Sequence, residues 1–371
     1  MRMYDRRFAA VALGVLVALS LVPAGRVMAQ SGGGGESAVP FLLIAPNSRS
    51  DGMGEAGTGV VDDASAIFWN PGALAFLDGK EVSITHASWL PQFNLSDLFY
   101  DYLNYRMRIE DIGGTVSASI TYLNLGEFTV TNSSGPTPID KFKSYEYAIT
   151  AGYATKATDD IGLGVNLRYI HSALSPIGTE REGGNGISST VSFDLAMMWR
   201  PQSLELLGTD IGKQFSLGIN LSNVGPKITY IDAAQADPLP TNLRLGLGYK
   251  LFEDEYNSMT MALDFSRLLV RRRGDGSDPL PKSLITSWDA VEGGLKKIIV
   301  SGGVEYWYGS PKLLAIRLGY FDESADWGNR KYLTFGAGIR YDLYGFDFSY
   351  ISAPEGSPLS DTIRFTLLIV W

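Results

Sequence analysis

The sequence predicts an all-β protein, a 14-stranded antiparallel transmembrane β-barrel of the outer-membrane type with an N-terminal plug segment. Three observations favour this fold class. Apolar and polar residues alternate in many short segments, the connections between them are alternately short and long, and a leader for export precedes them. We expect a signal peptide over residues 1–29, a plug or hatch segment over residues 30–80 and the barrel over residues 81–371.

The leader has the three parts of a secretory signal peptide. Arg2, Arg6 and Arg7 form a basic start, residues 8–22 form an apolar core, and residues 27–29 (VMA) form a small-residue cleavage site. The apolar core is too short for a membrane-spanning helix, which needs about 20 residues, and no other apolar run approaches that length. We therefore expect an exported chain that crosses no membrane with helices.

The composition of the mature chain excludes one class of partner. Without the four arginines and one aspartate of the leader, the remaining 342 residues carry 27 Lys and Arg against 39 Asp and Glu, a net charge of −12. Nucleic-acid binding depends on basic patches, so we expect no nucleic-acid partner. The chain has no Cys, and a closed barrel needs no disulfide because its hydrogen bonds run from strand to strand without an edge.

Residues 30–80 carry no long alternating run and form the predicted plug. A polar lead is followed by the glycine-rich residues 52–59 and by Asn70 and Pro71. Eight strands can be filled by their own side chains, whereas 16–18 strands leave an open channel. A barrel of intermediate size therefore needs a filling, and we expect this segment to fold inside it with short helical turns.

Fourteen alternating segments follow. The clearest is 161–172, in which Ile161, Leu163 and Val165 alternate with Gly162 and Gly164. Such alternation gives a strand one apolar and one polar face. The fourteen are 81–89, 98–108, 114–124, 143–154, 161–172, 188–199, 214–222, 242–252, 258–267, 298–308, 313–321, 331–341, 345–351 and 361–371.

The connections between these segments indicate how the barrel sits in the membrane. Connections that follow even-numbered strands are short, except 200–213, whereas those that follow odd-numbered strands are longer, among them 125–142 and 268–297. Outer-membrane barrels have short periplasmic turns and long extracellular loops. We therefore place both ends of the barrel on the periplasmic side.

The polar faces of the strands carry charges of both signs. An Arg that faced lipid at mid-depth would cost about 2–4 kcal/mol, so these residues are expected to line the interior. The favoured interpretation is a paired network that supports the barrel from within, and the alternative is a charged conduit. The residues are Glu146, Arg168, Asp194, Arg244, Asp264, Glu305, Arg317, Arg340, Asp347 and Arg364.

Motifs for cofactors and catalysis are weak. Residues 52–57 match G-x-G-x-x-G, but a dinucleotide site needs a preceding strand and a following helix, so tight turns of the plug are the better account. His86 and His171 lack metal-ligand spacing, and no GxSxG elbow accompanies them. We expect no cofactor, metal site or catalytic residue. The run 271–273 (RRR) is expected to be solvated.

Long and specific motifs are spread over nearly all of the mature chain. They are residues 41–54 (FLLIAPNSRSDGMG), 69–73 (WNPGA), 218–230 (GINLSNVGPKITY), 239–249 (LPTNLRLGLGY), 301–308 (SGGVEYWY), 317–321 (RLGYF), 328–341 (GNRKYLTFGAGIRY), 346–351 (FDFSYI) and 361–365 (DTIRF). In these stretches the chain resembles the PorV family of type IX secretion system outer-membrane proteins.

This resemblance implies a FadL-like barrel with a non-enzymatic role in protein secretion. The family receives cargo that carries a C-terminal secretion signal from the translocon barrel, and delivers it to a sortase-type attachment complex at the cell surface. Expected partners are therefore these three, together with the lipid bilayer and its lipopolysaccharide. A FadL-like transporter of hydrophobic small molecules remains the alternative function, and an outer-membrane lipid A hydrolase is a third.

The last segment, residues 361–371, is expected to close the barrel against the first. Its register places Ile363, Phe365, Leu367, Ile369 and Trp371 toward lipid and Arg364 inside. We expect Phe365 and Trp371 to form the signal that the barrel-assembly machinery reads, with Trp371 at the periplasmic rim.

Deletion of Trp371 should therefore lower the amount of barrel inserted into the outer membrane. The folded barrel can be measured as the band that changes mobility on heating. A Trp371→Phe variant, which keeps an aromatic residue there, should insert normally. Insertion of the deletion variant at the wild-type level would show that this residue carries no such signal.

Overall fold

A computed structural model describes residues 37–93, 97–132, 135–176, 185–231, 235–273, 276–289 and 294–371. The predicted signal peptide and the polar lead, residues 31–36, lie outside these ranges. Within them, no helix combines the length and apolar character that a membrane span requires.

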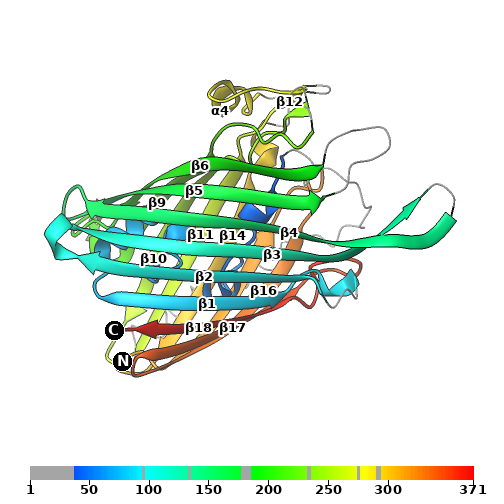
Figure 1. Cartoon of the computed structure of the whole chain (residues 1–371). Helices are drawn as coiled ribbons and strands as arrows, with labels where there is room; N and C mark the ends of the chain where they lie inside the picture. Colours follow the sequence, from blue (N-terminus) through cyan, green and yellow to red (C-terminus); the bar gives the residue numbers. More distant parts are fainter. Residues whose placement is uncertain are drawn as a thin grey trace. The chain divides into compact units, whose positions relative to one another are not determined.

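Fourteen antiparallel strands form a closed barrel, as predicted (Figure 1). Neighbouring strands in the chain pair with each other, and β1 pairs with β18 to close the ring. The strands are β1 (Lys80–Ser88), β2 (Phe99–Ile109), β3 (Gly114–Asn132), β4 (Gly135–Lys156), β5 (Ile161–Ser175), β6 (Gly186–Trp199), β9 (Phe215–Val224), β10 (Asn242–Glu253), β11 (Asn257–Leu268), β14 (Ile299–Tyr308), β15 (Leu314–Asp322), β16 (Lys331–Tyr341), β17 (Tyr344–Ser352) and β18 (Ile363–Val370).

Short elements occupy several connections. On the side of the short turns these are η4 (Glu110–Ile112), β7 (Glu205–Leu206), β8 (Thr209–Asp210) and η5 (Gly212–Gln214). On the side of the long loops they are η3 (Pro91–Phe93), β12 (Arg272–Arg273), β13 (Gly276–Ser277), α4 (Lys282–Thr286) and η8 (Gly294–Lys297).

Side-chain burial follows the predicted alternation. In β18, Phe365 and Leu367 are 44% and 56% exposed on the outer face, whereas Arg364 and Thr366 are buried on the inner face. The same pattern in β5 exposes Leu167 and buries Arg168. An apolar exterior around a polar interior is the arrangement that a barrel in lipid requires.

One predicted loop is wrong. Residues 125–132 and 135–142 do not form an irregular connection, because they belong to β3 and β4, which extend as a hairpin beyond the other strands (Figure 1). A register shift between Asn124 and Gly126 marks a bulge where the extension begins. Beyond it, Phe128 stacks on Phe142 with ring centroids 5.7 Å apart. Such a cross-strand aromatic pair contributes to the stability of the hairpin.

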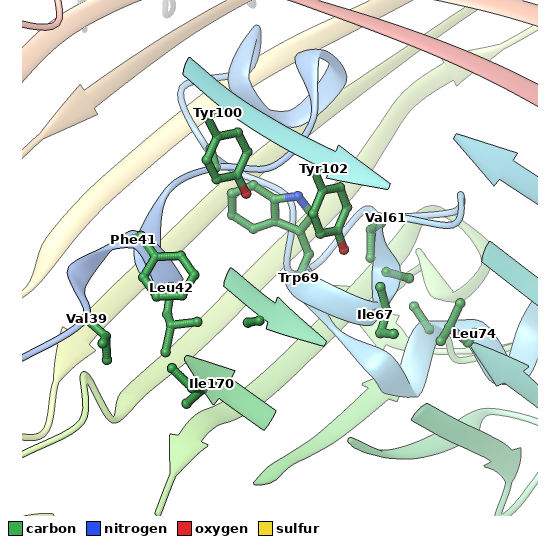
Figure 2. Packing of buried hydrophobic residues seen from close by; sticks show 14 of the residues in the cluster. Val39, Phe41, Leu42, Val61, Ile67, Trp69, Leu74, Tyr100, Tyr102 and Ile170 are labelled. Carbon is green, nitrogen blue, oxygen red and sulfur yellow. The ribbon is translucent and has the colours of Figure 1, made fainter. Parts of the chain in front are cut away.

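The chain before β1, residues 38–79, packs against the inner face of the barrel and is here termed the inner segment. It contains η1 (Pro40–Leu43), α2 (Ser48–Asp51), α3 (Ala66–Trp69) and η2 (Pro71–Phe76). Figure 2 shows Trp69 of α3 beside Tyr100 and Tyr102, which β2 directs inward. All three side chains are almost completely buried.

The inner segment runs from the loop end of the barrel to the turn end. At one end, Ala38 N–H donates to the carbonyl of Pro238, in the loop between β9 and β10, at 3.0 Å. At the other, Lys80 N–H donates to the carbonyl of Trp371 at 2.8 Å. The segment therefore passes through the whole interior before the chain enters β1.

Glycines let the backbone of the inner segment lie directly on the wall. A Cβ at Gly319 of β15 would lie 2.0 Å from the backbone nitrogen of Gly54, and one at Gly246 of β10 would lie 2.4 Å from that of Gly59. Gly54 itself has φ +71°, a conformation that glycine adopts without strain. The glycine-rich stretch thus serves tight turns and close backbone contact.

Replacing Gly303 of β14 by Ala should destabilise the barrel by roughly 1–3 kcal/mol, because overpacking displaces its neighbours. The new Cβ would lie 2.5 Å from the carbonyl oxygen of Met53. The midpoint temperature of the heat-dependent shift in gel mobility measures the effect. Gly302→Ala is the matched control, since its Cβ would meet nothing closer than 3.4 Å. Equal midpoints for the two variants would contradict the contact.

Candidate functional site

Glu305 of β14 joins the inner segment to the barrel wall. Its carboxylate accepts hydrogen bonds from Nε and Nη2 of Arg49 in α2, both at 2.8 Å, and from Nε of Arg317 in β15 at 2.7 Å. Arg317 Nη1 also donates to Asp347 of β17 at 2.8 Å, and Arg340 of β16 donates to Asp347 at 2.7 and 3.1 Å. These five residues are here termed the Glu305 network. The hydrogen bonds between them join charged groups and are therefore strong.

A second ion pair ties the inner segment to the closing strand. Arg364 of β18 pairs with Asp51 of α2, and both side chains are buried. Ser349 of β17 donates to the same carboxylate at 2.6 Å. Ser48 N–H donates to Thr366 Oγ1 at 3.0 Å. Helix α2 is thus bonded to both β17 and β18.

Arg168 and Asp194 form a two-pronged pair on β5 and β6. Two guanidinium nitrogens of Arg168 donate to the two carboxylate oxygens of Asp194 at 3.0 and 2.7 Å. Asn166 donates to Asp194 at 2.8 Å and to the carbonyl of Ile67 in the inner segment at 2.7 Å. The N–H of Asn223 completes the shell around Asp194 at 2.8 Å.

Asp264 and Arg244, on the neighbouring strands β11 and β10, contact the inner segment differently. Asp264 accepts the backbone N–H groups of Gly57 and Thr58 at 3.0 and 2.8 Å. The Arg244 guanidinium lies 4.8 Å from the ring centroid of Trp69, a distance typical of a cation–π contact. Both charges thus serve to hold the inner segment.

Asn70 and Pro71 start the last helical turn of the inner segment. The Asn70 amide donates to the carbonyls of Thr58 and Met197 at 3.1 and 3.0 Å. Its side-chain oxygen accepts the N–H of Gly72 at 3.0 Å, so it caps η2. Pro71 occupies the first position of η2, where its missing N–H costs nothing.

The other predicted residues lie apart from these contacts. Glu146 of β4 is buried and accepts a 2.7 Å hydrogen bond from Ser172, to which Tyr230 donates at 2.8 Å. Phe365 and Trp371 are exposed on the outer face. The Trp371 ring lies 6.3 Å from that of Tyr105 at the turn end of the barrel.

Several charged groups of the interior were not among the residues predicted from the sequence, including Arg49, Asp51, Arg106 and Glu81. Arg49 and Asp51 lie in a stretch that looked like a turn, and Arg106 donates to Glu81 at 2.9 Å between β2 and β1. The signal for Arg49 and Asp51 was a pair of opposite charges inside the predicted plug. Arg106 could have been found from the alternation of Tyr100 and Tyr102 with residues that face outward.

The two histidines lie on the outer face, away from the interior charges. His86 Nδ1 is 2.7 Å from the carboxylate of Asp101, and His171 Nδ1 is 2.8 Å from the hydroxyl of Ser189. The His171 ring is 5.0 Å from that of Tyr147. Aromatic rings of this kind mark the membrane interface of barrels.

The arginine run in the loop between β11 and β14 is not simply solvated. Arg271 pairs with Asp289 at 3.1 Å, and its side chain is only 11% exposed. Arg272 pairs with Asp237, in the loop between β9 and β10, at 2.6 Å. For Arg271 and Arg272 the prediction of a solvated run is therefore wrong, because this loop is folded against its neighbour.

An apolar pocket of about 440 Å³ lies between these two loops. It begins where the pairing of β6 with β9 stops at Phe193 and Val224, although β6 continues alongside β5 to Gly186. Its lining is mainly apolar, with Lys227 and Asp278 as the charged residues. The apolar lining includes Phe193, Val224, Leu239, Leu269, Val270 and Leu280.

The sequence matches one family model. The model of the type IX secretion system protein PorV matches residues 32–274, well over half of the chain. This range begins before the inner segment and ends in the loop that lines the apolar pocket. No curated protein matches the sequence.

Solved structures share the fold. The Pseudomonas putida toluene transporter TodX has a TM-score of 0.51 and 12% identity, over 88% of this chain and 97% of that chain. The Ralstonia pickettii toluene transporter TbuX has a TM-score of 0.45 and 13% identity, over 87% of this chain and 97% of that chain. At such identity the likeness to TodX establishes the barrel architecture alone.

Replacing Arg364 by Met should destabilise the barrel by about 3–5 kcal/mol, because the buried carboxylate of Asp51 then lacks its counter-charge. The double variant Arg364→Met with Asp51→Asn should recover much of this loss, since no buried charge remains. Unfolding in urea, followed on gels, measures both.

Arg108→Met is the control for this pair of variants. Arg108 pairs with Glu110 at 3.4 Å, and the Glu110 side chain is 81% exposed. Exposed pairs contribute little to stability. A single Arg364→Met variant as stable as this control, or as unstable as the double variant, would contradict the proposed role of the ion pair.

Proposed function

The chain belongs to the PorV family of type IX secretion system proteins, and from this we propose that it receives secreted cargo from the translocon and passes it to the attachment complex at the cell surface. The protein is a β-barrel of the outer membrane. The observation that carries the proposal is the match to the family model, which spans the inner segment and the first nine barrel strands.

The inner segment acts in this proposal as a plug. The Glu305 network and the pair between Arg364 and Asp51 hold it to β14–β18. Packing of η2 holds it to β4, β5 and β6 on the other side. Because the inner segment is attached to strands on both sides of the barrel interior, its release would expose several buried charges at once. A role at the rim therefore fits the barrel better than conduction through it.

The apolar pocket is the proposed contact for the C-terminal signal domain of the cargo. It lies between the two loops that pair Arg272 with Asp237, on the extracellular side. Apolar pockets with few charges suit the burial of side chains from a partner. The translocon barrel and the sortase-type complex are the other proposed protein partners, and lipid with lipopolysaccharide surrounds the wall. No catalytic step is assigned to any residue.

Transport of a hydrophobic small molecule is the second candidate function. The volume and apolar lining of the same pocket favour it, since small-molecule sites are concave and mostly apolar. Its ligand would reach the pocket beside Phe193, whose side chain is 44% exposed on the outer face.

Replacing Leu280 by Glu should block cargo export if the pocket binds the signal domain. A charge placed in an apolar contact costs far more than the loss of one side chain. The measurement is the fraction of a cargo protein at the cell surface, in a strain that carries only this variant. We expect cargo to accumulate in the periplasm, as in a deletion strain.

Ile285→Glu is the matched control, because Ile285 lies in the same loop, is 79% exposed and does not line the pocket. It should export normally. Normal export by the deletion strain would refute the secretion role itself. If that strain instead loses uptake of an aromatic hydrocarbon while its cargo reaches the surface, the transporter function is correct.

A further inference from the structure

Two adjacent leucines form the exposed tip of the longest turn on the periplasmic side. Leu206 is 57% exposed and Leu207 is 99% exposed, at the end of the small hairpin formed by β7 and β8. Scattered apolar residues on a surface need no explanation. Two adjacent leucines at the tip of a turn, with no side chain packed over Leu207, do need an explanation.

The turn itself disfavours leucine. Leu207 has φ 51° and Gly208 has φ 78°, which is the pattern of a type I′ turn with both central residues left-handed. Asn, Asp or Gly is preferred at the first of these positions. Asn329 and Asp342 follow that preference at their left-handed positions, whereas Leu90, with φ 50°, is a second leucine in this conformation. Leu207 therefore costs both folding free energy and solubility at this place.

Hydrogen bonds to Asp210 order the base of the hairpin, and the tip projects from this base. Asp210 accepts the N–H groups of Leu204 and Gly212 at 2.8 and 2.9 Å and the hydroxyl of Ser203 at 2.9 Å. These hydrogen bonds, led by that from Leu204 N–H, lower the pKa of Asp210. A two-stranded hairpin is marginal by itself, so this bracing supplies the order that a docking element needs.

Acidic groups lie beside the tip and at the base of the hairpin. Glu205 is exposed directly before the leucines, and Asp160 of the neighbouring turn accepts the N–H of Gln202 at the hairpin base at 3.3 Å. With Asp210 they outnumber Lys213, the one cation in residues 200–214 besides Arg200, which is directed to the inner segment. Anchors at a lipid interface are usually Trp, Tyr, Lys or Arg. Two leucines next to acidic residues therefore fit a protein partner better than a lipid surface.

We propose that this hairpin docks into an apolar pocket with a basic rim on a periplasmic protein. The two leucines fill the pocket, and Glu205 faces the cationic rim. The contact area is small, which fits a weak and reversible association. The proposal rests on the orientation of the barrel and does not depend on the secretion role.

The test places a photoreactive benzophenone side chain at Thr209, which pairs with Leu206 across the hairpin. Irradiated cells should give one protein adduct of a single mass. Leu207→Asn keeps the left-handed turn and should fold normally, yet it should lower the adduct yield roughly tenfold, as removal of a central interface side chain does. Glu205→Lys should lower it as well.

Ile112→Asn is the control, because Ile112 is 50% exposed on another periplasmic turn, and its yield should match the wild type. An adduct that persists unchanged in Leu207→Asn, or one to lipid only, would overturn the proposal. A second measurement uses Leu207→Cys, the only thiol in this cysteine-free chain. If brominated lipids quench a dye attached there in proteoliposomes, the tip contacts the membrane instead.

Discussion

Glu305 accepts hydrogen bonds from an arginine of the inner segment and from an arginine of the barrel wall. The arrangement of the rest of the interior depends on this double pairing. A buried charge that loses its partner costs several kcal/mol. The Glu305 network therefore couples the position of α2 to the registers of β14, β15, β16 and β17. The pair of Asp51 with Arg364 extends the same coupling to β18.

Glycine contacts and ion pairs make different contributions to holding the inner segment in place. The glycines bring two backbones together, which excludes side chains and water from the contact. The ion pairs then fix which part of the segment lies on which strand, because bidentate pairs such as Arg49 with Glu305 tolerate little displacement. Packing of Trp69 against Tyr100 and Tyr102 adds apolar burial on the opposite side.

Much of the barrel could be predicted because lipid imposes a period of two. Each of the fourteen alternating segments overlaps one strand, and Arg364 faces inward as its register requires. The extension of β3 and β4 was missed because both faces of that hairpin meet water, so no alternation marks it. The pairing of Glu305 with Arg49 could not be predicted, since Arg49 is remote in the sequence and nothing in its neighbourhood indicates a strand contact.

The candidate site was the least predictable part. The apolar pocket combines the end of one strand ladder with two loops, and such a combination depends on how the loops fold. The Arg272 pair with Asp237 shows the difficulty, because a run of three arginines suggests solvent rather than a contact between loops. The barrel architecture, by contrast, is shared with TodX.

The route of the inner segment constrains the order of events when the barrel is made. Ala38 bonds to the loop between β9 and β10, and Lys80 bonds to Trp371, which directly follows β18, so the segment spans the lumen before the first strand begins. Once β1 has paired with β18, threading the 42 residues of the inner segment through the closed barrel would require their charges to be unpaired during passage. Sealing the β1–β18 seam is therefore expected to be the last step, taken around a segment already in place.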